Sequence, residues 1–241
     1  MFPRVTAVLV VHRGGDRLRR TLAAIRAQHR APDELIIVLT DADAAARDDG
    51  AAANPSHIVS LSTRVAFGEA VRAAEGVLPP PSGDDEALWL LAEDTEPAPD
   101  TLSRLVAILE TERSVAIAGP KLMSWDAPDR IVGLGRSITR FGHAVDLVSD
   151  ELDQGQHDER SDVLGLDPAG LLVRHAVWRA LDGFDPGLPV IDDALDFSIR
   201  ARLAGHRVSV VPAARVVIGQ GGVAGPEAGP GRRARRRRRL E

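Results

Sequence analysis

The stretch Trp89-Leu90-Leu91-Ala92-Glu93-Asp94-Thr95-Glu96-Pro97 indicates the fold of this chain. Its apolar part is too short for a helix and ends in an acidic turn that Pro97 closes. This pattern is typical of a buried parallel strand with carboxylates at its carboxyl end, where ligands bind in open α/β sheets. Paired carboxylates there can hold a divalent cation and, through it, a diphosphate. A strand-to-helix turn capped by Asp94 or Thr95 fits the stretch equally well.

Apolar runs and helical patterns alternate on both sides of this strand. Further strands are expected at residues 6–11, 35–39, 58–61, 115–118, 170–173 and 207–211, with the fourth ended by Gly119-Pro120 and the last ended by Pro212. Helices are expected up to Gln28 and at 44–55, 67–76, 175–181 and 193–204, with another that begins at Thr101. This order predicts an α/β fold with a mostly parallel sheet and helices on both faces.

The region after Pro120 departs from this alternation. Residues 131–147 are expected to form a β-hairpin or an extended excursion, and residues 150–162 a polar loop over a cleft. The helix at 193–204 is expected to turn three apolar side chains inward: Leu195, Ile199 and Leu203.

Composition excludes several classes of function. The chain of 241 residues has no cysteine, so disulfide and thiolate chemistry is excluded, and a reducing compartment is compatible. Neither a bilayer-spanning run nor a signal peptide is present in the sequence. The net charge is −5, although arginines dominate residues 232–239, so the rest of the chain is more acidic still. An acidic body argues against nucleic-acid binding. A P-loop, a Ser-His-Asp order and an HExxH motif are all missing.

Four stretches in series resemble the family 2 glycosyltransferases of the GT-A fold, over roughly residues 4 to 217. The first is the opening strand and helix, ending at Gln28 before Pro32-Asp33-Glu34. The second is Arg64-Val65-Ala66-Phe67-Gly68-Glu69-Ala70-Val71-Arg72, similar to the family's N-x-G-F-G-x-A-x-N. The third is the acidic turn after Trp89. The fourth runs from Ala169-Gly170-Leu171-Leu172-Val173-Arg174 through Gly183-Phe184-Asp185 to Asp192-Asp193 and Arg200, similar to G-x-L-x-R, G-G-F-D and E-D-x-D-x-x-x-R.

A fifth stretch, Asp153-Gln154-Gly155-Gln156-His157-Asp158, looks like a motif of an actinobacterial subgroup of this family with membrane-embedded C-terminal regions. We call residues 153–158 the DQGQHD loop.

The resemblance implies that a nucleotide-diphosphate sugar binds across the first half of the sheet. The donor-binding residues it implies are His12, Arg13, Asp41, Arg64, Gly68 and Glu93. The family usually has an Asp directly after the second strand, where this chain has Leu39, so Asp41 would have to take its place. Asp41 and Asp43 fit a turn equally well, because Asp side chains mimic backbone turns. Arg64 also fits a solvated surface charge.

The resemblance also implies a divalent cation, Mn or Mg, in a reduced site. The family's Asp-x-Asp corresponds to Ala92-Glu93-Asp94, which leaves Asp94 as the metal ligand. A family His after the last strand would fall near Val217-Ile218-Gly219, where this chain has none. Because a hard cation needs several oxygen ligands, we expect metal binding that is weak, dependent on the donor, or absent.

The candidate catalytic residues are Asp193, Asp192 and Asp196. Direct displacement at an anomeric carbon with inversion needs one carboxylate to take the acceptor hydroxyl's proton. Asp193 is the candidate base, Asp192 the alternative, and Asp196 would orient neighbouring groups. Aspartates in a first helical turn also satisfy free amides without any catalysis. The family's second acidic residue falls at Ala194.

On the acceptor side, the resemblance implies four residues: Gln156, His157, Gly170 and Arg200. Trp125 and Trp178 are candidates for stacking on a sugar ring, although large aromatic side chains are first of all packing residues. His175 and His206 are expected to be exposed.

The sequence therefore predicts a GT-A domain at residues 1–218 and a disordered Gly/Pro/Arg-rich tail at 219–241, ending in an expression scar. The function that the resemblance implies is that of an inverting glycosyltransferase on the cytoplasmic face of the cell membrane. It would move sugar from a nucleotide-diphosphate donor to a glycan or lipid-linked acceptor of the cell envelope. The alternative is a catalytically degenerate module that binds nucleotide-sugar or scaffolds a membrane partner. The Arg232–Arg239 run is predicted to contact an anionic membrane surface, with a solvated tail as the alternative.

Overall fold

The acidic stretch of the sequence ends a central strand of a ten-stranded sheet. The computed structural model describes residues 4–78, 80–81, 83, 85–185, 187–188 and 192–219. The helices in this part are α1 (Asp16–Arg26), α2 (Ala44–Ala52), α3 (Phe67–Ala74), α4 (Thr101–Thr111), α5 (His175–Ala180) and α6 (Asp193–Leu203). The strands of the main sheet are β1 (Arg4–Val11), β2 (Glu34–Thr40), β3 (His57–Leu61), β4 (Glu86–Ala92), β5 (Thr95–Pro97), β6 (Val115–Ser124), β7 (Arg130–Gly133), β10 (Glu151–Leu152), β11 (Leu171–Arg174) and β12 (Arg207–Ile218). Strands β8 (Arg136–Ile138) and β9 (Ala144–Asp146) form the hairpin expected after Pro120.

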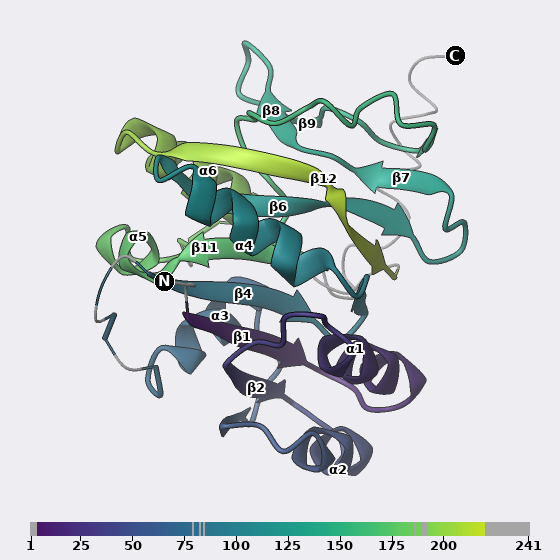
Figure 1. Cartoon of the computed structure of the whole chain (residues 1–241). Helices are drawn as coiled ribbons and strands as arrows, with labels where there is room; N and C mark the ends of the chain where they lie inside the picture. The colour runs from purple at the N-terminus through teal and green to yellow at the C-terminus, as the bar shows by residue number, and fades with distance from the viewer. Residues whose placement is uncertain are drawn as a thin grey trace.

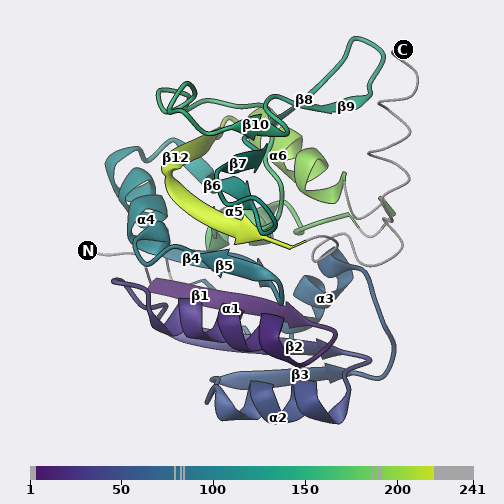
Figure 2. The ribbon, with the colours of Figure 1, turned by 90° about the vertical axis from the view of Figure 1, so that its right-hand side faces the viewer.

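The sheet is mostly parallel where the site was expected. Strand β1 pairs in parallel with β2 and β4, and β2 pairs in parallel with β3. The carboxyl ends of these four strands therefore lie on one edge of the sheet (Figures 1 and 2). Strand β11 runs antiparallel between β4 and β6, and β12 extends the sheet in parallel with β6.

The central strands are buried on both faces, as near-continuous apolar runs require. Alternate residues of β1 enter two separate cores: Val8 and Val10 pack with α3, α5 and α6, whereas Ala7 and Leu9 pack with α1 and α4. Figures 1 and 2 show these helix groups on opposite faces of the sheet. The prediction of a doubly covered, mostly parallel α/β sheet is confirmed.

Two strand ends were predicted wrongly at prolines. Strand β6 continues through Gly119-Pro120, and β12 continues through Pro212. The register between β12 and β6 shifts between Val211 and Arg215, and such an irregularity accommodates a residue that has no amide donor. The extended β12 also pairs with β5, which the sequence reading missed.

Helix α6 turns a different face to the core than predicted. Leu195 is buried, but Leu203 is 83% exposed, and Ala194, Phe197 and Ala201 line the core instead. Small residues and one aromatic ring at this spacing let the helix lie close to the sheet. The Phe197 ring lies 5.1 Å from Trp178, centroid to centroid. Trp178 is only 1% exposed, so it is a packing residue and not a sugar platform.

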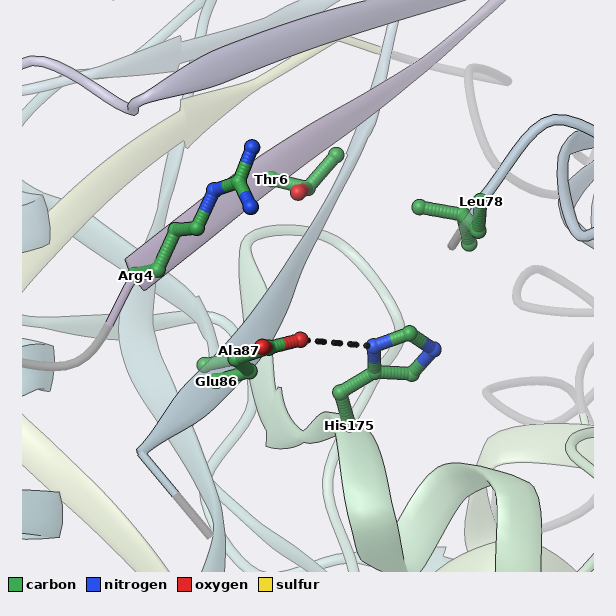
Figure 3. A pocket seen from close by; sticks show the side chains of 6 residues that line it. All are labelled: Arg4, Thr6, Leu78, Glu86, Ala87 and His175. Atoms are coloured by element: carbon green, nitrogen blue, oxygen red, sulfur yellow. Dashed lines mark ion pairs between the residues drawn. The ribbon is translucent and has the colours of Figure 1, made fainter. Parts of the chain in front are cut away.

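His175 was expected to be exposed, and this prediction is wrong. It begins α5, is 3% exposed, and its Nδ1 lies 3.6 Å from Glu86 Oε2. Figure 3 shows the pair in a small pocket with Arg4 and Thr6, at the amino ends of β1 and β4. This pocket therefore lies at the edge of the sheet opposite the carboxyl ends.

None of the helices in the described residues has both the length and the apolar character needed to cross a membrane. The predicted tail lies outside the described residues from position 220 onward.

Candidate active site

The acidic turn after β4 is tied to the loop after β1. Glu93 Oε2 accepts hydrogen bonds from the backbone amides of His12 (2.7 Å) and Arg13 (2.6 Å). The backbone carbonyl of Glu93 accepts another from the Thr21 hydroxyl at 2.9 Å. Glu93 therefore shapes the loop that carries His12 and Arg13, and its predicted contact with the donor stays a prediction.

His12 lies between several charged groups at the ends of β1 and β2. Its Nδ1 is hydrogen-bonded to the Thr40 hydroxyl. Burial lowers the pKa of His12, Arg64 and Arg13 lower it further, and Glu93 opposes them. The imidazole is thus neutral at pH 7, and the exposed Arg64 lies close enough to act on it. His12, Arg13 and Arg64, all predicted donor residues, gather at one place.

The residues after β2 divide between packing and turn formation. Leu39, in the position of the family Asp, is 3% exposed and belongs to the core. Asp43 Oδ1 caps α2 by accepting a hydrogen bond from the Ala46 amide at 2.7 Å. This contact agrees with the alternative in which Asp43 shapes the backbone after β2. Asp41 is exposed and its backbone has φ 47°, a left-handed conformation that turns favour. Its contact with a donor stays a prediction.

Gly68 joins the donor side of the site to helix α6. A Cβ atom placed on Gly68 would lie 2.9 Å from Asp193 Oδ2 and 3.2 Å from the Phe184 side chain. Glycine at the start of α3 therefore lets the Asp193 carboxylate lie directly against the helix backbone. Arg64, four residues before this glycine, acts on His12 at the end of β1, and Gly68 itself lies against Asp193 on α6. The ends of β1 and β4 and the start of α6 therefore lie along the same edge of the sheet.

Asp193 is a buried carboxylate with an altered acidity. It is 3% exposed, and its Oδ1 accepts a hydrogen bond from the Ala194 amide at 2.7 Å. Burial raises the pKa of Asp193 to about 7 and the charge of Asp192 adds to the rise, while the Ala194 amide and Arg136 oppose it. A carboxylate poised near neutral pH in a functional region is suited to general-base chemistry.

Gly68→Ala should interfere with Asp193. The added methyl would meet Asp193 Oδ2 at 2.9 Å, so either the carboxylate or Phe184 must move. Overpacking costs about 1–3 kcal/mol, partly offset by the better helix propensity of alanine, about 1 kcal/mol. We expect kcat of the predicted sugar-transfer reaction to fall at least tenfold, with a small loss of thermal stability.

Gly76→Ala is the matched control, because its nearest neighbour would be the Ala73 carbonyl at an ordinary 3.6 Å. Steady-state kinetics on both variants decides the point. Full activity of Gly68→Ala would show that this close approach does not matter.

The residues around Asp94 do not make a metal site by themselves. Asp94 is 2% exposed, and its backbone carbonyl accepts from the Gly219 amide at 3.1 Å. A Cβ at Gly219 would lie 2.9 Å from Asp94 Oδ2, so the position of the family's His faces this carboxylate but offers no side chain. Ala92 is buried and apolar, and Glu93 is bonded to backbone amides. Within the described residues there is also no group of three potential metal-ligating side chains.

The DQGQHD loop is held by a lysine that the sequence reading did not single out. Lys121 on β6 is fully buried, and its Nζ lies 2.8 Å from Asp153 Oδ1 and 2.7 Å from Asp158 Oδ1. Arg215 on β12 lies 2.9 Å from Asp153 Oδ2. Both ends of the motif therefore close on one ammonium group.

The two predicted acceptor residues of this loop are bonded to strand β10, which directly precedes it. His157 Nε2 lies 2.9 Å from Glu151 Oε2, and the Gln156 side-chain amide donates to the Leu152 carbonyl at 2.8 Å. The bond from His157 lowers the pKa of Glu151. These contacts give Gln156 and His157 a role in loop structure, and their contact with an acceptor stays a prediction.

Arg200 fixes the turn that follows α5. Its guanidinium donates to Asp196 Oδ2 and to the Gly183 carbonyl, both at 2.7 Å, and it lies 5.3 Å from the Phe197 ring centroid. Asp196 thus has a structural partner on its own helix. The catalytic role of Asp196 and the acceptor contact of Arg200 stay predictions.

Gly170 has a packing explanation. It has φ +77°, its amide donates to the Leu90 carbonyl at 2.9 Å, and a Cβ would meet Pro120 and Val216 at 3.0 Å. Only glycine suits this left-handed position at the start of β11. Its predicted contact with an acceptor stays a prediction.

Trp125 lies at the same edge as Gly219. Its amide donates to the Ile218 carbonyl at 3.1 Å, and Arg20 lies over its ring at 5.1 Å from the centroid. The half-buried ring therefore borders the Asp94 side of the site.

The sequence and the fold match those of known proteins. The family model described as "Glycosyltransferase like family 2" matches residues 3–238, so the chain belongs to that family. Among solved structures, GalNAc-T7 with UDP, GalNAc and Mn2+ has a TM-score of 0.67 at 14% identity, over 90% of this chain and 43% of that chain. The mannosyltransferase PcManGT from Pyrobaculum calidifontis, in complex with GDP-Man and Mn2+, has a TM-score of 0.65 at 14% identity, over 90% of this chain and 57% of that one. The predicted GT-A fold is thereby confirmed.

Two curated relatives are galactofuranosyltransferases. GlfT1 of Mycolicibacterium smegmatis is 34% identical over 128 residues, which is 53% of this chain and 42% of the relative. GlfT1 of Mycobacterium tuberculosis is 34% identical over 135 residues, 54% of this chain and 43% of the relative. The matched part thus spans less than half of each relative.

Proposed function

We propose that this chain is an inverting glycosyltransferase domain that moves a sugar from a nucleotide-diphosphate donor to a hydroxyl of a cell-envelope glycan or glycolipid. The observation that carries the proposal is Asp193: a buried carboxylate with a pKa raised to about 7, on the edge of the sheet that also carries His12 and Glu93. Membership of a glycosyltransferase family and the names of the GlfT1 relatives support the reaction class.

In the proposed reaction, the start of α6 and the ends of β1 and β4 have different roles. Asp193 takes the proton of the acceptor hydroxyl as that oxygen attacks the anomeric carbon, and the bond to the nucleotide diphosphate breaks with inversion. Arg13 and Arg64 would offset the negative charge that develops on the leaving diphosphate. The loop of His12, fixed by Glu93, would line the nucleoside pocket.

A divalent cation, if bound, would stabilise the diphosphate as a Lewis acid. Asp94 is the one carboxylate offered for it, so the remaining ligands would have to come from the donor and from water. We propose that manganese or magnesium binds weakly and only together with the donor.

A second candidate function is a catalytically degenerate module that binds nucleotide-sugar or scaffolds a membrane partner. Ala92, Leu39, Ala194 and Gly219 favour it, since each lacks a polar group that the family resemblance expects. For either function we propose that the domain works on the cytoplasmic face of the membrane, with Arg232–Arg239 against anionic lipid.

Nucleotide binding and turnover separate the two functions. UDP and GDP should each be titrated against thermal stability with and without Mn2+, followed by assays of UDP-sugar and GDP-sugar hydrolysis. We expect stabilisation by one of the nucleotides, little change with Mn2+ in its absence, and measurable donor turnover. Stabilisation without turnover of any donor supports the degenerate module that binds nucleotide-sugar. The absence of any nucleotide effect contradicts the enzyme and favours the degenerate module that scaffolds a membrane partner.

A further inference from the structure

Arg136 is a buried cation at the root of the β8–β9 hairpin. It is only 5% exposed. Arginine is almost never buried unless it is paired with other charged groups. Its guanidinium faces carboxylates from three segments of the chain: Asp146 on β9 at 3.4 Å, Asp167 before β11 at 4.0 Å and Asp192 at the start of α6 at 3.5 Å.

The backbone of Arg136 is also fixed against α6. Its amide donates to the Gly165 carbonyl at 2.7 Å, and the Gly165 amide donates back at 3.1 Å. A Cβ on Gly165 would lie 2.4 Å from the Leu195 side chain and 3.3 Å from Ser198, so glycine lets this bridge lie directly on the helix. Backbone and side chain together hold Arg136 beside the first turn of α6.

We propose that Arg136 is a positioning residue for sugar transfer: it holds the first turn of α6 through Asp192 and keeps a positive charge beside Asp193. The inference rests on the proposed function, in which Asp193 is the base. It explains why a hairpin outside the α/β core carries a buried arginine, and why that arginine lies beside this helix.

The charges around Asp193 determine the effect of removing Arg136. Helix α6 itself contributes Asp192, and Asp196, which is bonded to Arg200. The hairpin contributes Arg136, which also faces Asp146 on β9 and Asp167 before β11, and α3 presents the uncharged Gly68. Without Arg136, the negative charge of Asp192 would act on the base with no cation beside it as a counterweight. The pKa of Asp193 would then rise, and less of it would be ionised at neutral pH.

The experiment is the pH profile of kcat/KM for Arg136→Met, Arg136→Lys and the wild type. We expect the acid limb of the Arg136→Met profile to move up by about one pH unit or more, with a roughly tenfold loss at pH 6.5 that alkaline pH restores. Arg136→Lys should keep the wild-type midpoint. Arg130→Met is the matched control, because Arg130 on β7 pairs with Asp150 and its side chain is 41% exposed. A uniform loss at every pH, or an unchanged profile, overturns the proposal.

A readout without substrate keeps this test separate from the proposed function. The denaturant midpoint of unfolding is measured from pH 4 to 9 for a protein that keeps Asp193 and for its Asp193→Asn variant. The difference between the two midpoints changes with pH and becomes constant above the pKa of Asp193, and we call the pH at which this happens the levelling pH. We expect the levelling pH to be higher in the Arg136→Met background than in the wild-type background. If Arg136→Met does not fold, Asp192→Asn takes its place and should lower the levelling pH. An unchanged levelling pH refutes the inference, whereas absent turnover in the wild type refutes only the proposed function.

Discussion

Asp193→Asn should abolish sugar transfer and leave donor binding intact. The amide cannot take a proton from the acceptor hydroxyl, and loss of a general base typically costs about 10²–10⁴-fold in rate. Its Oδ1 can still accept the Ala194 amide, so the first turn of α6 should keep its shape. In the proposed site the donor binds on the β1 and β4 side, so the thermal shift with nucleotide should match that of the wild type.

The same substitution should stabilise the fold at neutral and higher pH. Because the folded pKa of Asp193 is raised from 3.8 to about 7, the folded state binds more protons than the unfolded state between these values. Stability from this group is therefore complete below about pH 4 and is lost as pH rises through 7, on the order of 4 kcal/mol in total. An amide at this position does not titrate, so the variant does not lose this stability. The free energy of unfolding of the variant should therefore rise relative to that of the wild type as pH increases from about 4 to about 7.

Asp192→Asn and Asp196→Asn are the comparisons that assign the base. Asp192 is about half exposed and pairs with Arg136, and Asp196 pairs with Arg200, so neither needs to be the proton acceptor. Steady-state kinetics and denaturant titrations at pH 4 and pH 8 test all three variants. If Asp193→Asn transfers sugar normally while Asp192→Asn is inactive, the assignment moves to Asp192.

The sequence predicted the edge of the sheet that carries Asp94 and Asp193 because short local patterns mark the ends of strands. Apolar runs that stop at Asp94 and before Thr40, and an acidic start to α6, mark positions that a parallel sheet brings to one side. Arg136 and Lys121 carried no such signal. Each is a single basic residue in a polar or turn-like context, and only the folding of residues 130–160 onto β6 and α6 buries it.

The errors at Pro120, Pro212 and Leu203 have a related origin. Local preferences end a strand at proline, but the pairing of β12 with β6 carries both strands past their prolines. Local preferences also turn leucine inward, but in α6 the ring of Phe197 packs against Trp178 in the core and Leu203 stays exposed. Tertiary contacts, which no short window contains, decided these positions.

Lys121→Met should destabilise the fold more than other single changes at charged residues of the described chain. The Lys121 side chain is fully buried against its two carboxylate partners, and the Asp153 side chain is 5% exposed. Burial alone would raise the pKa of Asp153, but the bond from Lys121, the Gly155 amide and Arg215 together lower it. Removing one partner of a buried pair leaves an uncompensated charge, at a cost of about 3–5 kcal/mol, and Arg215 should hold the loss to the lower end.

The pH dependence gives the prediction its sign. A carboxylate whose folded pKa is depressed contributes stability above its unfolded pKa and loses it as pH falls through the folded value. The gap between wild type and Lys121→Met should therefore be widest near pH 7 and narrow below pH 4. Adding Asp153→Asn should recover part of the loss at pH 7, because the uncompensated charge is then gone. Arg130→Met, which breaks an exposed pair, should cost less than about 1 kcal/mol. Equal losses in the two single variants would mean that the lysine beneath the DQGQHD loop contributes no more than a surface ion pair.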